Sequence, residues 1–479
     1  MSAQHEQEYN DAASEGLSLL VAQYEAQQKT GNLRYLDLQE YLDIIEFYEQ
    51  GFLSEKALEA AQKAIILYPF SAQLYIKQAQ VLLDLGQAEE ANAVLDKAHA
   101  YEPDGLDILL TRVEIYNRLQ YFDEAHEILE KARQRVSQDD EEYLDILLLE
   151  AAICESQHQF ELAFDNLYTI LCQDADYEPA AIRLRMLLEQ VETDFLIQIL
   201  PLLQTLVDNS PYSHWAWTSL GFAQGQAEQI EEALESFEYA VLIDENFAFA
   251  RYDAVDLLMN AARYAEAAVI LTDCIRIFGA HAETYLRLAE AHYELKNYDL
   301  ALSFCEKTIK MDSCEGRVYE LIGDVYLETA QPQKALHNFE LAFRADKSNP
   351  DFALSLAGAY VALFNFQKAH DFYQKAIALA IDNTDYWFAY LEFLIDESLY
   401  SLGFVLIETA RQQFSNALLD YAEAALLILS GKRQEGLLLL MQTLQAAFSD
   451  SDFLFALAPE LANDTAVMEW VDLFARQQK

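Results

Sequence analysis

An alanine recurs along this chain every 34 residues, and this period constrains the fold more than any other feature of the sequence. One run contains Ala57, Ala91 and Ala125, and a second contains Ala233, Ala267, Ala301, Ala335 and Ala369. Gly403 and Gly436 continue the second run, and Ala163 and Ile199 stand between the runs after strides of 38 and 36. A fixed period of this length indicates stacked supersecondary units that pack on their neighbours.

Residues at fixed distances from these key alanines also repeat, and they describe a pair of helices. Bulky residues such as Phe339 follow four positions later and alanines such as Ala342 seven positions later, which places them on one helical face. Twelve positions earlier a compact residue such as Gly323 recurs, where it lets two helices approach closely. Strand signals are few. The sequence therefore predicts an all-α chain of helix pairs.

The pattern resembles the tetratricopeptide repeat, which reads W-x2-L-G-x2-Y, then A-x3-F, then P. Matching residues in three units are Trp217, Leu220, Gly221, Ala233 and Phe237; Tyr319, Ile322, Gly323, Tyr326, Ala335 and Phe339; and Tyr48, Ala57, Ala64 and Pro69. The resemblance covers about residues 38–449. It implies an α-solenoid in which about a dozen antiparallel helix pairs stack into a right-handed superhelix.

The repeat divides the chain into five predicted segments. These are an N-terminal helical cap or extension (1–37), repeats (38–179), a degenerate repeat that forms an irregular joint (180–213), further repeats (214–449) and a C-terminal capping helix (450–479). The joint is predicted because Ile199 replaces the alanine and Pro201 would distort the second helix. A longer turn is expected near 139–142. The apolar tail could instead dock a partner.

Composition limits the classes of partner. Lys and Arg total 31 against 80 Asp and Glu, a formal net charge of −49. Such an excess repels nucleic acid and anionic lipid and attracts basic proteins, although solubility is an alternative explanation. No apolar run reaches 18 residues, so no membrane insertion is expected. Five dispersed cysteines and a polar N-terminus predict reduced thiols in a cytoplasmic protein.

Catalytic motifs are missing from the sequence. It contains no complete phosphate-binding loop, no G-x-G-x-x-G, no H-E-x-x-H and no Cys-x-x-Cys. We therefore expect a non-enzymatic protein without a cofactor or a metal site. In tetratricopeptide modules that clamp the carboxylate of a chaperone tail, Lys, Arg and Asn stand on the first helices, but the corresponding places here are mostly acidic. Asn117 and Arg118 are an isolated exception in an early repeat, so such a clamp is disfavoured.

The resemblance implies that the first helix of each pair lines a concave groove, at positions 18, 15, 11, 8 and 7 before the key alanine. In the four units keyed on Ala301, Ala335, Ala369 and Gly403, only Arg317 is basic at these positions. The acidic residues there are Glu283, Glu290, Glu294, Glu320, Asp324, Glu328, Asp351, Asp385, Glu392 and Asp396. The two preceding units place Trp215, Thr218, Phe222, Phe249, Tyr252, Asp256 and Met259 there.

An apolar, aromatic section followed by an acidic one is therefore predicted for the groove. The candidate partner-binding residues are Trp215, Phe222, Phe249, Tyr252, Asp256, Glu283, Glu290, Glu294, Glu320, Asp324, Glu328, Asp385, Glu392 and Asp396. Aromatic side chains bury large areas against a partner. Core packing remains open for Trp215 and Phe222, and a merely solvated face remains open for the acids.

These features favour a scaffold or adaptor that holds a basic, or mixed basic and apolar, segment of a protein partner. A chaperone or assembly factor for a basic client is the first alternative, and a peptide-sensing regulator is the second. No direct contact with nucleic acid is expected. Self-association through terminal repeats is a further hypothesis, because Trp470 and Phe474 lie in the tail.

Overall fold

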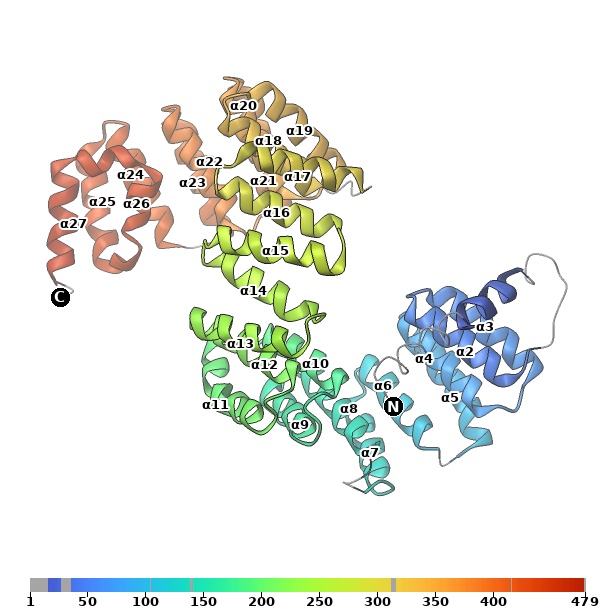
Figure 1. Ribbon diagram of the computed structural model, residues 1–479. Helices are drawn as coiled ribbons and strands as arrows, with labels where there is room; N and C mark the ends of the chain where they lie inside the picture. The colour runs from blue at the N-terminus through green and yellow to red at the C-terminus, as the bar shows by residue number, and fades with distance from the viewer. Residues whose placement is uncertain are drawn as a thin grey trace. The chain divides into compact units, whose positions relative to one another are not determined.

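A computed structural model describes residues 16–26, 36–103, 105–137, 140, 142–311, 316–414 and 416–477. The described residues form helices and turns without a strand, which confirms the all-α solenoid (Figure 1). The chain divides into two compact units, Met1–Ala254 (unit 1) and Val255–Lys479 (unit 2), each of which is described by itself.

The first helix that the structure describes in unit 1 covers residues 16–26, and antiparallel pairs of helices follow it (Figure 1). Its helices are α2 (Leu38–Gln50), α3 (Ser54–Leu67), α4 (Ala72–Asp84), α5 (Ala88–Tyr101), α6 (Leu106–Arg118), α7 (Phe122–Arg133), α8 (Glu142–Ser156), α9 (Phe160–Gln173), α10 (Glu178–Leu188), α11 (Thr193–Asn209), α12 (His214–Gln226) and α13 (Ile230–Ile243). The next helix, α14 (Ala248–Asn260), begins in unit 1 and ends in unit 2.

Unit 2 repeats the same arrangement of a first and a second helix. Its helices are α15 (Tyr264–Phe278), α16 (Ala282–Glu294), α17 (Tyr298–Lys310), α18 (Gly316–Glu328), α19 (Pro332–Ala345), α20 (Pro350–Ala362), α21 (Phe366–Leu379), α22 (Thr384–Asp396), α23 (Tyr400–Gln413), α24 (Ala417–Leu429), α25 (Arg433–Ala446), α26 (Asp452–Leu457) and α27 (Thr465–Gln477). Short 3-10 helices, η1 (Phe448–Asp450) and η2 (Pro459–Asn463), flank α26.

The key alanines explain the period, because each one lies where two helices of a pair meet. All the alanines of the two regular runs have a relative exposure of 0%. In α18, Gly323 stands where a Cβ atom would come within 2.4 Å of the Phe339 ring of α19. A small residue on one helix therefore receives a large residue of its partner, and this complementarity fixes how closely the pair packs.

A left-handed backbone residue recurs in the turn inside the pairs, two positions after the first helix ends. Most of these residues are not glycine: Phe52, Gln120, His158, Glu228, Ala262, Lys296, Ala330, Phe364 and Ser398. Gly86 and Gly431 occupy the same position in two other pairs. The amide after this residue donates to a carbonyl five positions earlier, as from Gln331 to Tyr326 at 2.7 Å. This hydrogen bond closes the first helix.

Replacing Ala330 with glycine is expected to stabilise the protein by about 1 kcal/mol, because its φ of 56° strains any residue that carries a Cβ atom. Gly86→Ala is the matched control: its φ is +74°, and an added Cβ atom would meet nothing within 4 Å. That substitution should destabilise by about as much through the backbone alone. Urea unfolding of both variants measures the two changes in the free energy of unfolding. Changes of the same sign in the two variants would contradict the prediction.

Helices α10 and α11 depart from the regular pairing. Helix α10 has 11 residues and packs on α9 and α12, whereas α11 has 17 residues, contains Pro201 and packs on α12. Ile199 fills the position of the key alanine and is 4% exposed. The missing amide of Pro201 removes one hydrogen bond within α11. The predicted boundaries of the joint at 180 and 213 stay predictions.

The C-terminal segment is more divided than the single capping helix that the sequence predicts. Residues after α25 form η1, α26, η2 and α27 in turn. Trp470 and Phe474 of α27 pack partly against the apolar core around Leu454 and Val467. Leu473 is 44% exposed, and Glu469 and other polar residues share the outward surface of the helix. Whether this end self-associates stays a prediction.

Candidate functional site

The aromatic residues predicted for the groove differ in their accessibility. Trp215 of α12 is only 5% exposed, because its ring packs edge-on against the ring of Phe247. The centroid of the Trp215 ring lies 4.7 Å from that of Phe247 and 5.3 Å from that of Phe249. Phe249 of α14 is 47% exposed. Trp215 therefore belongs to the core of unit 1, and Phe249 is the ring that this cluster presents to solvent.

Phe222 and Tyr252 are both half-buried. The guanidinium of Arg185 covers the ring of Phe222, with its central carbon 3.4 Å from the ring centroid. The same guanidinium forms an ion pair with Asp253 on α14. The side chain of Arg185 therefore already covers the Phe222 ring. Neither the spacing nor the composition of the sequence indicates this contact.

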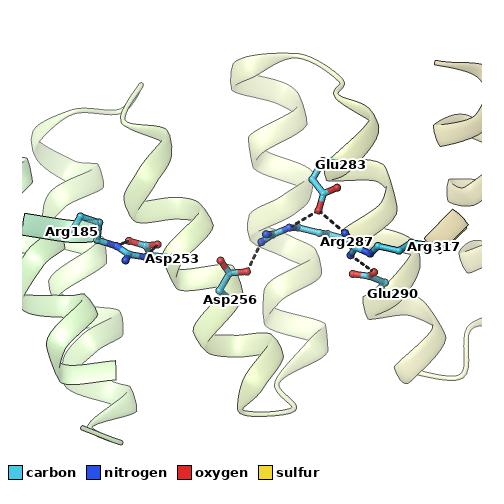
Figure 2. Close-up of polar contacts among 7 residues, drawn as sticks. All are labelled: Arg185, Asp253, Asp256, Glu283, Arg287, Glu290 and Arg317. Atoms are coloured by element: carbon cyan, nitrogen blue, oxygen red, sulfur yellow. Dashed lines mark hydrogen bonds and ion pairs between the residues drawn. The ribbon is translucent and has the colours of Figure 1, made fainter. Parts of the chain in front are cut away.

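Three of the predicted acids in unit 2 already have cationic partners (Figure 2). Arg287 pairs with Asp256 and lies 3.3 Å from Glu283. Arg317 lies 3.7 Å from Glu283 and 2.8 Å from Glu290. The excess of acids over bases at the groove positions therefore overstates the negative charge that is available to a partner.

The remaining acids of α16 and α18 form what we call the acidic patch: Glu294, Glu320, Asp324 and Glu328. Burial, followed by the charges of Glu320 and Glu328, raises the pKa of Asp324 from 3.8 to about 7. Ser355 donates a hydrogen bond of 2.8 Å to Glu320, and Tyr298 donates one of 3.4 Å to Glu328. Within the part of the chain that the structure describes, Asp324 forms no ion pair.

A neighbouring tyrosine, Tyr293, feels the charges of three members of the acidic patch. Burial raises the pKa of Tyr293 to about 12, and the charges of Asp324, Glu328 and Glu294 add to this effect. A phenol resists ionisation near carboxylates because its own negative charge would be repelled. The patch is therefore a concentrated negative surface on the first helices of unit 2.

The three predicted acids of α22 are exposed. Asp385 lies in the first turn of the helix, and Glu392 and Asp396 lie one turn apart near its end. Burial raises the pKa of Glu392, and the charge of Asp396 raises it further. Because like charges on one helix destabilise each other, these two carboxylates would also gain from a cation.

Unit 1 contains a hollow surface that was not among the predicted site residues. One cavity of about 560 Å³ and another of about 540 Å³ are lined by first helices of unit 1. Their linings include Gln39, Leu42, Glu46, Glu49, Gln73, Ile76, Gln80, Leu83, Asp84, Asp107, Leu110, Glu114, Asn117, Arg118, Asp145, Leu148, Ala152, Glu155 and Ser156. All of these residues stand at the five groove positions counted from Ala57, Ala91, Ala125 and Ala163. The same rule applied to the first repeats would have found them.

This hollow carries both signs of charge. Lys77 lies 3.2 Å from Glu49, and Arg183 lies 3.0 Å from Glu155. Burial raises the pKa of Glu114, and the charge of Asp84 raises it further while Arg118 opposes the shift. The hollow is therefore closer to charge balance than the acidic patch.

One further position of the repeat supplies charged groups that the five groove positions omit. It lies 14 residues before the key residue, where Lys77, Arg185, Asp253 and Arg287 stand. Each of these four side chains forms an ion pair with another first helix. At this position Lys77 and Arg287 neutralise groove acids, and Arg317 and Arg183, which stand at other positions of the repeat, neutralise further ones.

The described ranges contain no group of three His, Cys, Asp or Glu side chains arranged to hold a metal ion. None of the helices there combines the length and the apolar character that crossing a membrane requires. Cys154, Cys274 and Cys305 are buried free thiols, Cys172 is an exposed one, and Cys314 lies outside the described residues.

Sequence comparisons identify the type of repeat. Family models described as tetratricopeptide repeat match residues 82–151, 252–313 and 321–384. The TPR repeat-containing protein YpiA of Bacillus subtilis (strain 168) is 19% identical over 362 residues, 76% of this chain and 84% of that protein. The 43 kDa receptor-associated protein of the synapse from Tetronarce californica is 30% identical over 158 residues, 30% of this chain and 37% of its own.

One solved structure is also similar to this chain. The Cut9–Hcn1 hetero-tetramer of the APC/C contains a chain that is 15% identical, with a TM-score of 0.40, and the match covers 97% of this chain and 94% of that one. Matches to the repeat lie in both units of this protein, along the period that the buried alanines set. The chain therefore contains tetratricopeptide repeats in both units, and proteins built from this repeat act as scaffolds for protein interactions and are typically not enzymes.

Proposed function

We propose that this protein is a non-enzymatic scaffold that holds a basic, partly extended segment of a protein partner against the acidic patch of unit 2. The observation that carries the proposal is Asp324, a half-buried carboxylate whose neighbours are acids and whose pKa is raised to about 7. A lysine or arginine of a partner would provide the missing cation. Attraction of this kind favours association strongly when the site is partly desolvated.

Other exposed residues, considered within each unit by itself, fit the same kind of partner. Glu392 and Asp396 on α22 offer further exposed carboxylates in unit 2. In unit 1, the exposed ring of Phe249 would accept an apolar side chain of the partner. The net charge of −49 would also speed encounter with a basic protein over a distance limited by salt screening.

Removing two charges from the acidic patch should weaken binding of a basic segment about tenfold, because each partly buried contact with a cation is worth roughly 0.5–1 kcal/mol. The variant is Asp324→Asn with Glu328→Gln. The matched control is Asp382→Asn with Glu408→Gln, two exposed residues of unit 2 outside the first helices. Both double variants have the same formal net charge, and above the pKa of Asp324, at pH 8, they have lost nearly the same ionised charge.

Fluorescence anisotropy of a labelled synthetic peptide of lysine, arginine and leucine provides the measurement, at low and at high salt. Binding by a cation lowers the pKa of Asp324, so wild-type affinity should rise between pH 6 and pH 8 and this rise should disappear in the patch variant. An equal loss of affinity in both double variants would show that net charge alone attracts the peptide, and the proposal would fail.

A further inference from the structure

The guanidinium of Arg185 is held by groups from two other helices. Its Nε and Nη2 atoms donate to the two carboxylate oxygens of Asp253, at 3.1 and 2.7 Å (Figure 2). Its central carbon lies 3.4 Å from the centroid of the Phe222 ring. A bidentate carboxylate and a stacked aromatic ring are together the chemistry by which proteins recognise an arginine side chain.

This arrangement is nearly closed to water. The Arg185 side chain is 14% exposed and the Asp253 side chain 9% exposed. Shielding from water strengthens the attraction between the two charges. It also makes an empty site costly, because Arg185 is the only cation among the described residues that forms an ion pair with Asp253. A guanidinium from another source could satisfy the same carboxylate and ring.

The receiving groups are positioned by contacts that do not involve Arg185. Phe222 follows Gly221, whose Cα atom packs so closely that a Cβ atom there would lie 2.8 Å from Phe237. Asp253 stands between the buried residues Ala250 and Ala254 on α14. Both side chains should therefore keep their places when Arg185 is absent.

Arg185 also has an alternative partner on its own helix. Glu189 lies one turn further along α10, and its carboxylate is 2.9 Å from the Nη1 atom of Arg185. The Glu189 side chain is 58% exposed. If Arg185 left Asp253, it would retain an ion pair in solvent, which lowers the cost of its displacement.

We infer that Asp253 and Phe222 form an arginine-binding site in unit 1, which the chain fills with its own Arg185 when no partner is bound. An arginine of a bound segment enters the site as Arg185 moves toward Glu189. This inference rests on the proposed function only in its choice of a basic partner. A lysine is a poorer occupant, because its ammonium cannot bridge both oxygens of Asp253 or stack flat on the ring.

A first experiment tests the site without any partner. Arg185→Ala should bind methylguanidinium, observed by isothermal titration calorimetry and as a rise in melting temperature, whereas wild-type protein should not. Methylammonium at the same ionic strength should bind at least tenfold more weakly, because it lacks the fork of donors. The double variant Arg185→Ala, Asp253→Asn should lose the binding.

Arg185→Gln is the second variant, in case truncation to alanine prevents folding. Glutamine keeps the carbon stem of arginine up to Cδ and has no charge, so α10 should pack normally. Its side chain is two heavy atoms shorter than that of arginine, so methylguanidinium should still find room beside Asp253. If neither folded variant takes up methylguanidinium better than wild-type protein does, Arg185 only braces the helices, and the inference is wrong.

A second experiment tests displacement by a segment. The labelled arginine-containing peptide should bind Arg185→Ala more tightly than wild-type protein, and a version with lysine at every arginine should show no such gain. Equal gains for both peptides would contradict an arginine-specific site. The site that binds methylguanidinium lies in unit 1, so its binding should be unchanged when Asp324→Asn and Glu328→Gln are introduced in unit 2. A failure of the acidic patch and a failure of this site therefore give different results.

Discussion

Replacing Phe339 with alanine is expected to destabilise unit 2 by about 3–5 kcal/mol, the usual cost of emptying a buried aromatic site. Phe339 has a relative exposure of 0% and packs in one apolar cluster with Leu356, Ala357 and Tyr360 of the next repeat. Its ring also faces Gly323, where no side chain fills the space. The cavity would therefore loosen α18, α19 and α20 together.

Hydrogen exchange followed by mass spectrometry, together with urea unfolding, would measure this loss. A measurement that resolves individual helices is needed, because the stability of a repeat array is distributed over neighbouring repeats and such arrays can unfold in more than one transition. Phe364→Ala is the matched control: Phe364 is 82% exposed, so the same change should cost about 0.5 kcal/mol or less. Similar losses in the two variants would contradict the packing described for Phe339.

A paired substitution tests the fit between the two helices. Gly323→Ala should cost about 1–3 kcal/mol in the wild-type background, because its Cβ atom would come within 2.4 Å of the Phe339 ring. In the Phe339→Ala background the same methyl group occupies part of the cavity and should cost less. Additive losses would show that the close approach of α18 and α19 does not depend on this contact.

Asp324→Asn is expected to stabilise the protein by about 1–2 kcal/mol at pH 8 and to have little effect at pH 4. The folded chain holds the pKa of Asp324 at about 7, against 3.8 for an unperturbed aspartate. Between these pH values the folded state keeps a proton that the unfolded state has lost. The contribution of this group to stability therefore falls as pH rises from about 4 to about 7.

Urea unfolding at several pH values would measure the difference between wild type and variant. The expected curve rises from near zero at pH 4 to a plateau above pH 7, because the asparagine has no charge to desolvate. Asp382→Asn, at an exposed turn position, is the control. If the difference in the free energy of unfolding between wild type and Asp324→Asn did not change with pH, water would reach the carboxylate freely. The acidic patch would then not be a desolvated site for a cation.

Part of the candidate site followed from counting along the repeat, and part did not. The five groove positions identify Asp324 and its acidic neighbours, and they would also have identified the hollow of unit 1 had they been applied to Ala91 and Ala125. They omit the position of Arg185 and Arg287, so the neutralisation of Glu283 and the covering of Phe222 were not predicted. Arg287 and Glu283 lie four positions apart on one helix, whereas Arg185 and Asp253 are 68 positions apart, so the second pairing depends on how distant helices pack.

The sequence by itself determined the helix pairs, their period and the excess of acid, because each follows from local spacing and composition. A small residue every 34 positions requires a close helix contact at the same place in every unit. Only the tertiary structure decided which side chains remain available. Trp215 and Phe249 stand at equivalent groove positions, yet one is 5% and the other 47% exposed. The physical reason is that exposure and charge pairing depend on the neighbouring helix, whose contribution no single repeat contains.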